Sequence, residues 1–483
     1  MTENNTHGYQ EWWDESFTYR YPVDLSNPMG LPRRNEPVTV EMTFEEAQVH
    51  PNSIRVVDSG GDETPSQVHD ETVGDEELQT AHVTFLADVT DAEETYHVYA
   101  DEGIRDVPEY GGIQQLDPQL ADGVKRLDTG HYVLELCRGM ADGTAGGKWG
   151  IRYFEAKSEG RNLIADCGNA IGGFYGPFFT PENGKVNPPE HTKVNVTTDV
   201  EGPVYARYRF DGTVPPGLDP RLRDKDFEIT WEFFANTPWF RRRYDVDPYQ
   251  TVVDGMSVEN KITVGDEFES GQGDVVLSQF GAAGGTYYRE GDRYANILAD
   301  RVEHLLSLPP EEAPDGLQSF TDELGDDLME MNWDYFWRLF CVEDDILSHE
   351  DILDHVDDIV EEAHRQVHHT DRKDDVKIED FVTVPEREDQ TIFPMNADKT
   401  VELSPETGYG MIWYTSEPVA RYQIVQRPAS GWVNWGTNGE NEYPELPIGT
   451  TIYTGYDQFD DWEEDARKIE YRLEPKFRQI EQR

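Results

Sequence analysis

The stretch "EFFANTPWFRRRYDVDP", residues 232–248, places three arginines side by side after a short turn. The letters "ANTP" separate two runs rich in aromatic and β-branched residues, so the stretch predicts an antiparallel hairpin. Neighbouring side chains in a strand point to opposite faces. We therefore expect Arg241 and Arg243 on one face, and Arg242 on the other face with Tyr244.

Similar short runs with alternating polarity extend in both directions from this hairpin. Residues 16–100 contain "FTYRYPVDL", "VTVEMTF", "AHVTFLADV" and "TYHVYAD", and residues 124–285 contain "HYVLELCR", "WGIRYFEAK" and "VYARYRF". Strands separated by Gly, Pro and Asn turns are typical of antiparallel sandwiches. The sequence predicts a mostly β protein, with a small N-terminal β-domain (1–103) and a large antiparallel β-sandwich, or supersandwich (104–483).

Helical periodicity interrupts this β pattern in the second domain. "HEDILDHVDDIVEEAHRQV" has one apolar face at helical spacing, so we expect a helical insertion at about 289–380. Two histidines four residues apart in this segment, His364 and His368, are a weak metal signal, and a solvated helix face is the favoured interpretation. The tail "WEEDARKIEYRLEPKFRQI" is also expected to be helical.

The chain is strongly acidic, with a formal net charge of −57 and a pI near 4.3. Aromatic residues make up 12% of it, a content that disfavours disorder. A folded core under an acidic shell suits a salt-saturated cytoplasm, where screening reduces self-repulsion. We interpret the chain as a halophilic protein from a haloarchaeon.

Composition also argues against several kinds of partner and site. The negative charge disfavours nucleic-acid binding, and an apolar run of membrane-spanning length is absent. The N-terminal residues do not form a signal peptide, so we expect a cytoplasmic location. Cys137, Cys167 and Cys341 are too widely spaced to indicate a disulfide framework or a cysteine zinc site.

One contiguous segment departs from the acidic pattern. Residues 145–249 hold 14 Lys and Arg against 15 Asp and Glu, so the other 378 residues carry −56 of the −57 charges. Arginine binds carboxylates through bidentate hydrogen bonds, and tyrosine stacks on sugar rings. The segment therefore predicts a site for an acidic ligand that includes Arg207, Arg241, Arg243 and Tyr205. The alternative is that each arginine pairs with an acid on a neighbouring strand.

Two long loops add candidates to this site. "DCGNAIGGFYGPFFTPENGKVNPPEHTK" holds Tyr175, Lys185 and His191, and "PASGWVNWGTNGENEYPELP" holds Trp432 and Trp435. Long loops with aromatic residues often carry function. Packing of these aromatic rings inside the fold is the alternative.

The N-terminal residues resemble a domain of a known enzyme family. The runs "WWDESFTYRYPVDLSN", "AQVHPNSIRVVDSGGDETPSQVHDE" and "AHVTFLADVTDAEETYHVYAD" resemble the N-terminal β-domain of exo-acting rhamnogalacturonan lyases and related polysaccharide lyases. The resemblance covers about 85 residues well, and the strands that follow are similar in outline to a galactose-mutarotase-like supersandwich. It implies β-elimination on a uronic acid, although no catalytic motif matches residue by residue.

In that reaction a cation neutralises the substrate carboxylate, while a base and an acid move protons. We expect His191, Tyr205 and Tyr244 as catalytic residues, with the substrate bound by Arg207, Arg241, Arg243, Lys185, Tyr175, Trp432 and Trp435. The expected partner is an acidic oligosaccharide, with no nucleic acid and no membrane, and self-association is left open. No cofactor is expected, although a divalent cation stays open. A glycoside hydrolase or sugar epimerase on the same scaffold, and a non-catalytic carbohydrate-binding or assembly protein, are the alternatives.

The charge of −57 generates a first testable expectation. Dialysis from molar salt into about 0.1 M salt lengthens the Debye length to roughly 10 Å. Repulsion within the acidic shell then increases, and the chain should unfold. Circular dichroism before and after dialysis measures the change, and an unchanged spectrum in low salt would refute the expectation.

Overall fold

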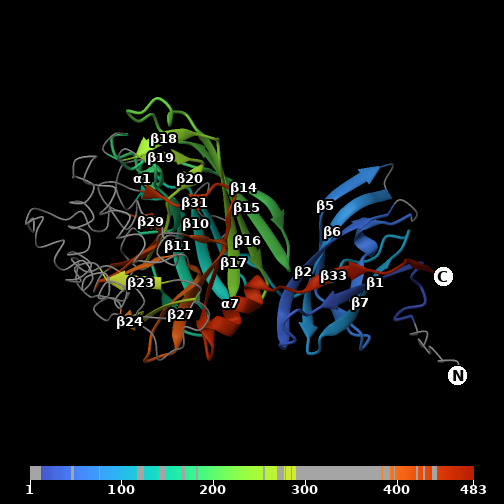
Figure 1. Ribbon diagram of the computed structural model, residues 1–483. Coiled ribbons are helices and arrows are strands. Elements are labelled where there is room, and N and C mark those ends of the chain that lie inside the picture. Colours follow the sequence, from blue (N-terminus) through green and yellow to red (C-terminus); the bar gives the residue numbers. More distant parts are fainter. Residues whose placement is uncertain are drawn as a thin grey trace, which may run out of the picture.

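The computed structural model shows a mostly β, antiparallel protein in which a smaller β-domain packs beside a large sandwich (Figure 1). The residues that the structure describes are 12–44, 48–74, 77–116, 124–140, 147–164, 169–180, 183–253, 256–268, 277, 279–283, 286–289, 382–383, 392–395, 397–419, 422–427, 430–437 and 443–483. The expected fold class is confirmed.

The smaller domain consists of two sheets around a shared apolar core. Its first sheet has the order β33–β1–β7–β3–β4, with β34 also paired to β1; the strands are β1 (Tyr19–Ser26), β3 (Arg55–Val57), β4 (Glu63–Thr64), β7 (Glu93–Ala100), β33 (Glu474–Phe477) and β34 (Glu481–Gln482). Its second sheet has the order β2–β6–β5, with β2 (Arg33–Thr43), β5 (Ser66–Gly74) and β6 (Glu77–Val89). A 3-10 turn, η1 (Pro51–Ser53), precedes β3.

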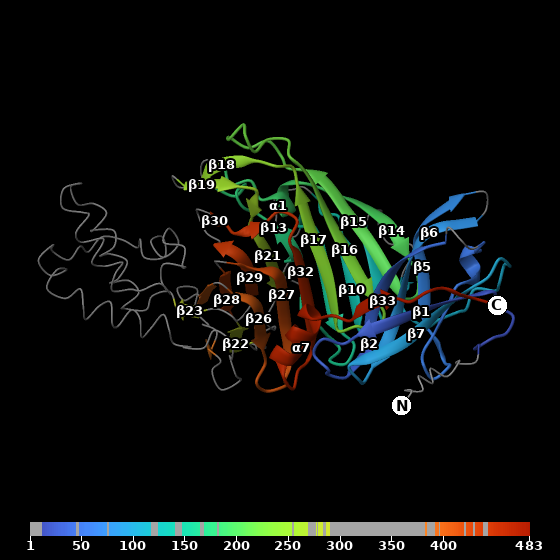
Figure 2. The same ribbon diagram turned by 45° about the vertical axis from the view of Figure 1, so that its right-hand side comes forward.

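The sandwich consists of two large sheets that face each other (Figure 2). Among the described residues the first, here called the 12-stranded sheet, contains β8 (Gln114–Leu116), β9 (Val124–Asp128), β10 (Tyr132–Cys137), β11 (Gly150–Ala156), β12 (Arg161–Asn162), β13 (Ile171–Phe174), β21 (Val264–Phe268), β23 (Thr286–Arg289), β25 (Ile392–Met395), β28 (Tyr422–Arg427), β29 (Ser430–Thr437) and β30 (Tyr443–Pro444).

The 9-stranded sheet lies opposite it in the order β14–β15–β16–β17–β32–β27–β26–β22–β24. Its strands are β14 (Asn195–Glu201), β15 (Tyr205–Thr213), β16 (Asp226–Phe234), β17 (Trp239–Val246), β22 (Gln279–Ala283), β24 (Val382–Thr383), β26 (Ala397–Leu403), β27 (Tyr409–Val419) and β32 (Thr451–Gln458). Smaller elements are the ladders β18 (Gln250–Val253) with β19 (Met256–Glu259) and β20 (Lys261–Ile262) with β31 (Leu446–Pro447), and the helices α1 (Pro188–His191) and α7 (Trp462–Glu470).

The opening stretch of the sequence forms the hairpin that it predicts. Strands β16 and β17 are antiparallel, with Glu232 opposite Arg241 and Trp231 opposite Arg242. The turn between them contains Asn236 at a φ of +54°, a left-handed conformation that asparagine tolerates better than most residues. Arg242 consequently points into the sandwich, where its side chain is fully buried.

A buried ion pair joins the two sheets of the sandwich. Nη2 of Arg242 on β17 donates to both carboxylate oxygens of Asp266 on β21, at 2.7 and 2.6 Å. The Trp413 indole nitrogen donates to Oδ2 of Asp266 at 2.7 Å, and the amide of Gly172 donates to Oδ1 at 2.9 Å. The carboxylate thus receives hydrogen bonds from both sheets, as a buried charge requires.

Aromatic rings surround the guanidinium of Arg242. Its carbon lies 5.8 Å from the ring centre of Trp231 and 5.7 Å from that of Trp435, one ring from each sheet. Gly172 allows this packing, because a Cβ atom there would lie 2.2 Å from the Trp231 ring. The cation is therefore desolvated by close apolar contact and stabilised by one carboxylate and by the ring faces.

Breaking this ion pair should be costly. Arg242→Met or Asp266→Asn leaves one buried charge without its partner, and each should lower the free energy of unfolding by about 3–5 kcal/mol. Denaturant titration in high salt measures the change, with Arg243→Met as the matched control. Arg243 is exposed, so its substitution should change stability by less than about 0.5 kcal/mol. Equal effects at both arginines would contradict a special role for the buried pair.

Glu402 on β26 is another buried ionisable residue, and it has no ion-pair partner among the described residues. Its side chain is 0% exposed, and neither carboxylate oxygen has a hydrogen-bond partner in the described part of the chain. Burial raises the pKa of Glu402 well above its ordinary value of 4.5. Burial therefore favours the neutral, protonated form of this side chain in the folded protein.

The raised pKa predicts how Glu402 changes stability with pH. Above pH 4.5 the unfolded chain releases this proton while the folded chain keeps it, so stability falls as pH rises toward the folded pKa. Glu402→Gln cannot ionise and should remove that part of the pH dependence. At pH 7 the variant should therefore be more stable than the wild type. Denaturant titrations of both proteins at acidic and neutral pH test this, and a variant that is less stable at pH 7 would oppose it.

The C-terminal residues alter the expected division at residue 103. Strands β33 and β34 pair with β1, so the end of the chain completes a sheet of the N-terminal domain. The tail expected to be wholly helical forms α7 and then these strands. The expected insertion at 289–380 lies outside the described residues, apart from Arg289 at the end of β23.

Candidate functional site

Three of the expected site residues lie near one another on the outer face of the 9-stranded sheet: Tyr205, Arg207 and Arg241. Tyr205 Oη donates to Oε1 of Glu232 at 2.5 Å, and Arg241 binds the same carboxylate at 2.5 and 2.8 Å. Arg207, on the same strand as Tyr205, binds Asp70 of the N-terminal domain at 2.6 and 3.0 Å. These two arginines are therefore paired with acids of the protein itself.

Ionisation of this group follows from the same contacts. Burial alone would raise the pKa of Glu232, but the hydrogen bonds from Arg241 and Tyr205 lower it. Burial and the Glu232 charge raise the pKa of Tyr205 far above its ordinary range. Tyr205 is thus a protonated donor. The N-terminal domain also covers it, because the Gln67 side chain bonds to its backbone at 2.9 and 3.0 Å.

Two expected site residues lie in the core. Tyr244 is fully buried, and its hydroxyl donates to the carbonyl of Gly172 at 3.0 Å. Trp435 is also fully buried and packs edge-on against Trp413, with ring centres 6.2 Å apart. The structure thus places the Tyr244 hydroxyl and the Trp435 ring where they stabilise the sandwich, away from any surface for a substrate.

The remaining expected residues are dispersed. Arg243 is exposed and pairs with Asp245 at 3.0 Å. His191 ends α1, where its Nδ1 lies 2.8 Å from the carbonyl of Asn187. Lys185 is exposed and has a φ of +52°. Trp432 lies on β29 opposite Glu267, and its side chain is outside the described residues.

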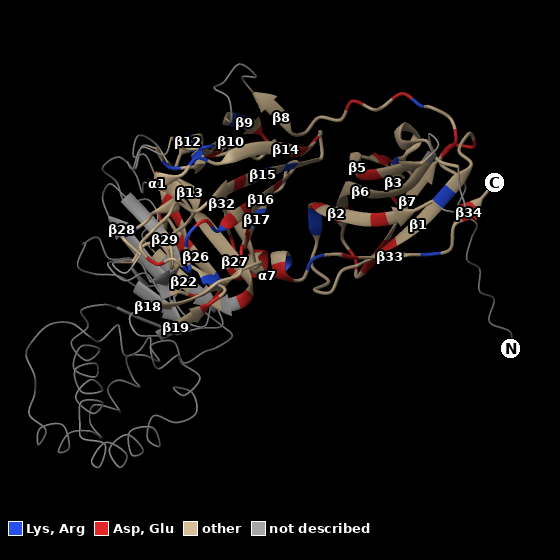
Figure 3. Ribbon diagram, turned by 90° about the horizontal axis from the view of Figure 1, so that it is seen from above, with Lys and Arg blue, Asp and Glu red and all other residues tan. Residues whose placement is uncertain are grey.

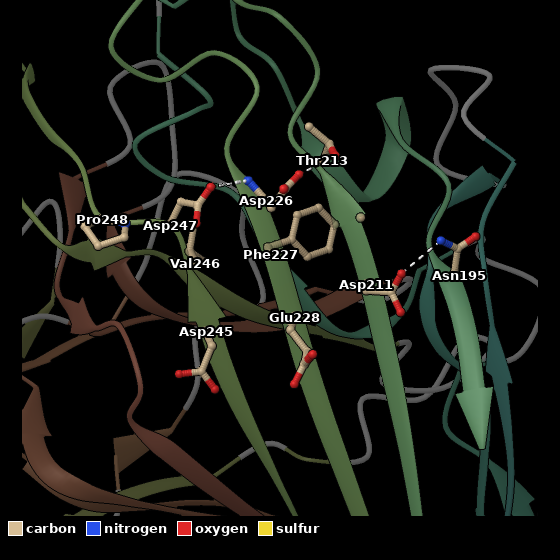
Figure 4. A pocket seen from close by; sticks show the side chains of 11 residues that line it. Asn195, Asp211, Thr213, Asp226, Phe227, Glu228, Asp245, Val246, Asp247 and Pro248 are labelled. Atoms are coloured by element: carbon tan, nitrogen blue, oxygen red, sulfur yellow. Dashed lines mark hydrogen bonds between the residues drawn. The ribbon is translucent and has the colours of Figure 1, made fainter. Parts of the chain in front are cut away.

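Acidic side chains line a pocket at one end of the 9-stranded sheet (Figure 4). Its volume is about 600 Å³, and its charged lining residues are Asp211, Asp226, Glu228, Asp245 and Asp247. Figure 3 shows acidic and basic residues interleaved over the strands β14–β17. The charged residues that line the pocket are all acidic, although the segment 145–249 is nearly neutral as a whole. This pocket would repel an anionic ligand.

The opposite surface, on the outer face of the 12-stranded sheet, carries a different group, here called the lysine cluster: Lys148, Tyr175, Glu190 and Glu267. Lys148 forms a close ion pair with Oε2 of Glu267, and its Nζ lies 3.6 Å from Oε1 of Glu190. Tyr175 Oη donates to Oε1 of Glu267 at 2.9 Å. One carboxylate therefore contacts both an ammonium group and a phenol.

Local packing brings the lysine cluster together. Trp149 pairs with α1, since its amide donates to the carbonyl of Pro189 at 3.2 Å and its indole to that of Pro188 at 3.1 Å. This contact places Lys148, the preceding residue, beside Glu190. At Gly173 a Cβ atom would lie 2.7 Å from the Tyr175 hydroxyl, so glycine is required there.

Three side chains of the cluster are largely but not completely buried, and the fourth residue, Tyr175, is 3% exposed. The exposed fractions are 7% for Lys148, 13% for Glu267 and 21% for Glu190. Partial burial strengthens the electrostatic interactions among them relative to open water. The arrangement brings together two carboxylates, an ammonium group and a tyrosine hydroxyl, which are groups that general acid–base catalysis can use.

Polar residues extend along the same sheet face from this cluster. A β-bulge in β11 turns both Arg152 and Tyr153 outward, since the register shifts between Glu135 and Leu136 of the paired strand. The guanidinium of Arg126 lies 4.7 Å from the Tyr153 ring centre. An outward aromatic ring beside charged groups is a suitable surface for stacking a sugar.

A cysteine on this face is unsuited to nucleophilic chemistry. Burial raises the pKa of the Cys137 thiol to about 12, and the neighbouring Glu135 carboxylate adds to the shift. The thiol is protonated at neutral pH, whereas nucleophilic attack needs the thiolate. Carboxylates are therefore the better candidates for chemistry on this face.

Sequence reasoning found Tyr175 but not its partners. Lys148 lies within the near-neutral segment, yet nothing in its local sequence distinguishes it from the other lysines. Glu190 and Glu267 belong to a chain with 98 acidic residues, and only their position separates them from the rest. The one available signal was the alternation in "TVGDEF" (263–268), where a buried Asp266 implies an outward Glu267.

No family model matches the chain, and no curated protein matches it. Similar solved structures include an alpha-mannosidase from Enterococcus faecalis V583, at 12% identity and a TM-score of 0.44, covering 96% of this chain and 46% of the other. A protein of glycosyl hydrolase family 38 from Enterococcus faecalis has 10% identity and a TM-score of 0.45, with 95% and 47% covered. A candidate aldose 1-epimerase from Escherichia coli K12 has 9% identity and a TM-score of 0.35, with 72% and 100% covered. The chain spans about half the length of the first two.

No helix among the residues that the structure describes is long and apolar enough to cross a membrane.

Proposed function

We propose that the protein is a carbohydrate-active enzyme that performs acid–base catalysis at the lysine cluster. The observation that carries the proposal is the Glu267 carboxylate, which is bound by Lys148 on one oxygen and by Tyr175 on the other. A second carboxylate, Glu190, contacts the same lysine. The sugar would lie on the outer face of the 12-stranded sheet, beside Tyr153.

Each residue of the cluster has a distinct role in this proposal. Lys148 forms an ion pair with Glu267 and holds it in place, and Glu267 acts as the base or nucleophile. Tyr175 orients Glu267 through its hydrogen bond, and Glu190 serves as the second acid–base group. Hydrolysis of a glycosidic bond uses two carboxylates that flank the bond. Glu190 and Glu267 would supply these two carboxylates.

Epimerisation of a sugar is the second candidate, because the Tyr175 hydroxyl on Glu267 offers a proton donor beside a proton acceptor. β-Elimination on a uronic acid, which the N-terminal resemblance implies, needs a cation for the substrate carboxylate. Lys148, Arg207 and Arg241 already contact carboxylates of the protein. The geometry consequently favours hydrolysis or epimerisation over elimination.

The proposal is tested by incubating the protein in high salt with neutral and uronic-acid oligosaccharides. New reducing ends indicate hydrolysis, ultraviolet absorbance of an unsaturated uronate indicates elimination, and a changed sugar configuration by NMR indicates epimerisation. Glu267→Gln should lower kcat by about a hundredfold or more, because general acid–base groups contribute that much. Glu228→Gln, an exposed carboxylate in the acidic pocket, is the matched control and should retain full activity.

A structural role for the cluster gives a different pattern. If Glu267 only stabilised the fold, Glu267→Gln would lower the melting temperature and leave the kcat of the folded fraction unchanged. Full activity of that variant would therefore overturn the proposal. Sugar binding without turnover by the wild type would instead identify a non-catalytic carbohydrate-binding protein.

A further inference from the structure

Two histidines face each other across the second sheet of the N-terminal domain. His69 on β5 and His82 on β6 are direct partners in the antiparallel register. Their rings stack with centres 5.5 Å apart. Directly opposed side chains on one face of a sheet lie close enough to share a ligand.

A β-bulge adds a carboxylate to this histidine pair. Asp70 follows His69, so in a regular strand it would point to the opposite face. The register shifts between His69 and Thr72, and Asp70 adopts a φ of +52°. The bulge turns its Oδ2 atom to 3.0 Å from Nδ1 of His69 and 3.5 Å from Nδ1 of His82.

The three side chains present their ligand atoms toward one point. Those atoms lie within 4.8 Å of one another. Nε2 of His69 lies 2.8 Å from Oγ1 of Thr84, a contact that fixes the ring and leaves Nδ1 for the shared point. Nδ1 of His82 is buried and has no hydrogen-bond partner among the described residues. A buried nitrogen without a hydrogen bond is unusual in a folded protein, and a bound ion would supply its partner.

Side chains of the sandwich also contact His69 and Asp70. Arg207 on β15 donates to Oδ1 of Asp70 at 2.6 Å and to Oδ2 at 3.0 Å. Each carboxylate oxygen has two lone pairs, so Oδ2 can bind a metal while Arg207 stays in place. The Tyr205 ring lies 4.7 Å from the His69 ring and closes that side of the group.

We propose that His69, Asp70 and His82 form a binding site for one divalent transition-metal ion of the zinc type. Two imidazoles and one carboxylate match the ligands of such ions and leave a fourth position for water. Because Asp70 also binds Arg207 of the sandwich, the ion would stabilise the contact between the two domains. The inference is independent of the sugar chemistry proposed for the lysine cluster.

Cobalt serves as the probe, because Co²⁺ bound in a tetrahedral nitrogen and oxygen site absorbs visible light. The full chain is treated with a chelator in high salt and titrated with Co²⁺. His69→Gln and His82→Gln should each lose one equivalent of Co²⁺ relative to the wild type. His131→Gln is the matched control: His131 lies 3.7 Å from Asp457, and no second histidine joins that pair in the described residues.

A rescue variant separates metal binding from folding. His82 is 37% exposed, so His82→Cys is tolerable and supplies a thiolate ligand. It should restore the lost equivalent and add an intense sulfur-to-cobalt absorption band. Saturating Zn²⁺ should also raise the melting temperature of the wild type and the control, but not that of His82→Gln. Equal Co²⁺ stoichiometry in wild type and His82→Gln, or no sulfur-to-cobalt band in His82→Cys, would overturn the proposal.

Discussion

The buried ion pair between Arg242 and Asp266 constrains the whole sandwich. It is the point where a cation from one sheet meets an anion from the other, with both side chains fully buried. A buried ion pair is stabilising only when both partners stay in place, because an unpaired buried charge is strongly unfavourable. The pair therefore favours a single alignment of β17 over β21.

That alignment determines which face each neighbouring residue takes. Because Arg242 points inward, Arg241 and Arg243 must point outward, where they pair with acids of the 9-stranded sheet. Because Asp266 points inward, Glu267 must point outward, where it meets Lys148. Glu267 directly follows Asp266 on β21. The ion pair that joins the two sheets therefore also places Glu267 in the lysine cluster.

Departures from strict alternation place the remaining polar groups. Bulges turn Arg152 and Tyr153 together onto the outer face of the 12-stranded sheet, and Asp70 onto the face of His69. In a regular strand each pair of neighbours would be divided between two faces. Both the proposed sugar surface and the proposed metal site depend on these local irregularities.

The sequence by itself determined the β class, the hairpin at 232–248 and the opposite directions of Arg242 and its neighbours, because alternation is a local property of the strand. It could not place Glu190 or Glu267, since acidic residues are abundant throughout the chain. Nor could it show that Arg207 would meet Asp70, because that contact joins residues more than 130 positions apart. Long-range pairing of strands, bulges and the return of the C-terminal strands to β1 were decided by tertiary structure alone, because they depend on which surfaces pack together in the folded chain.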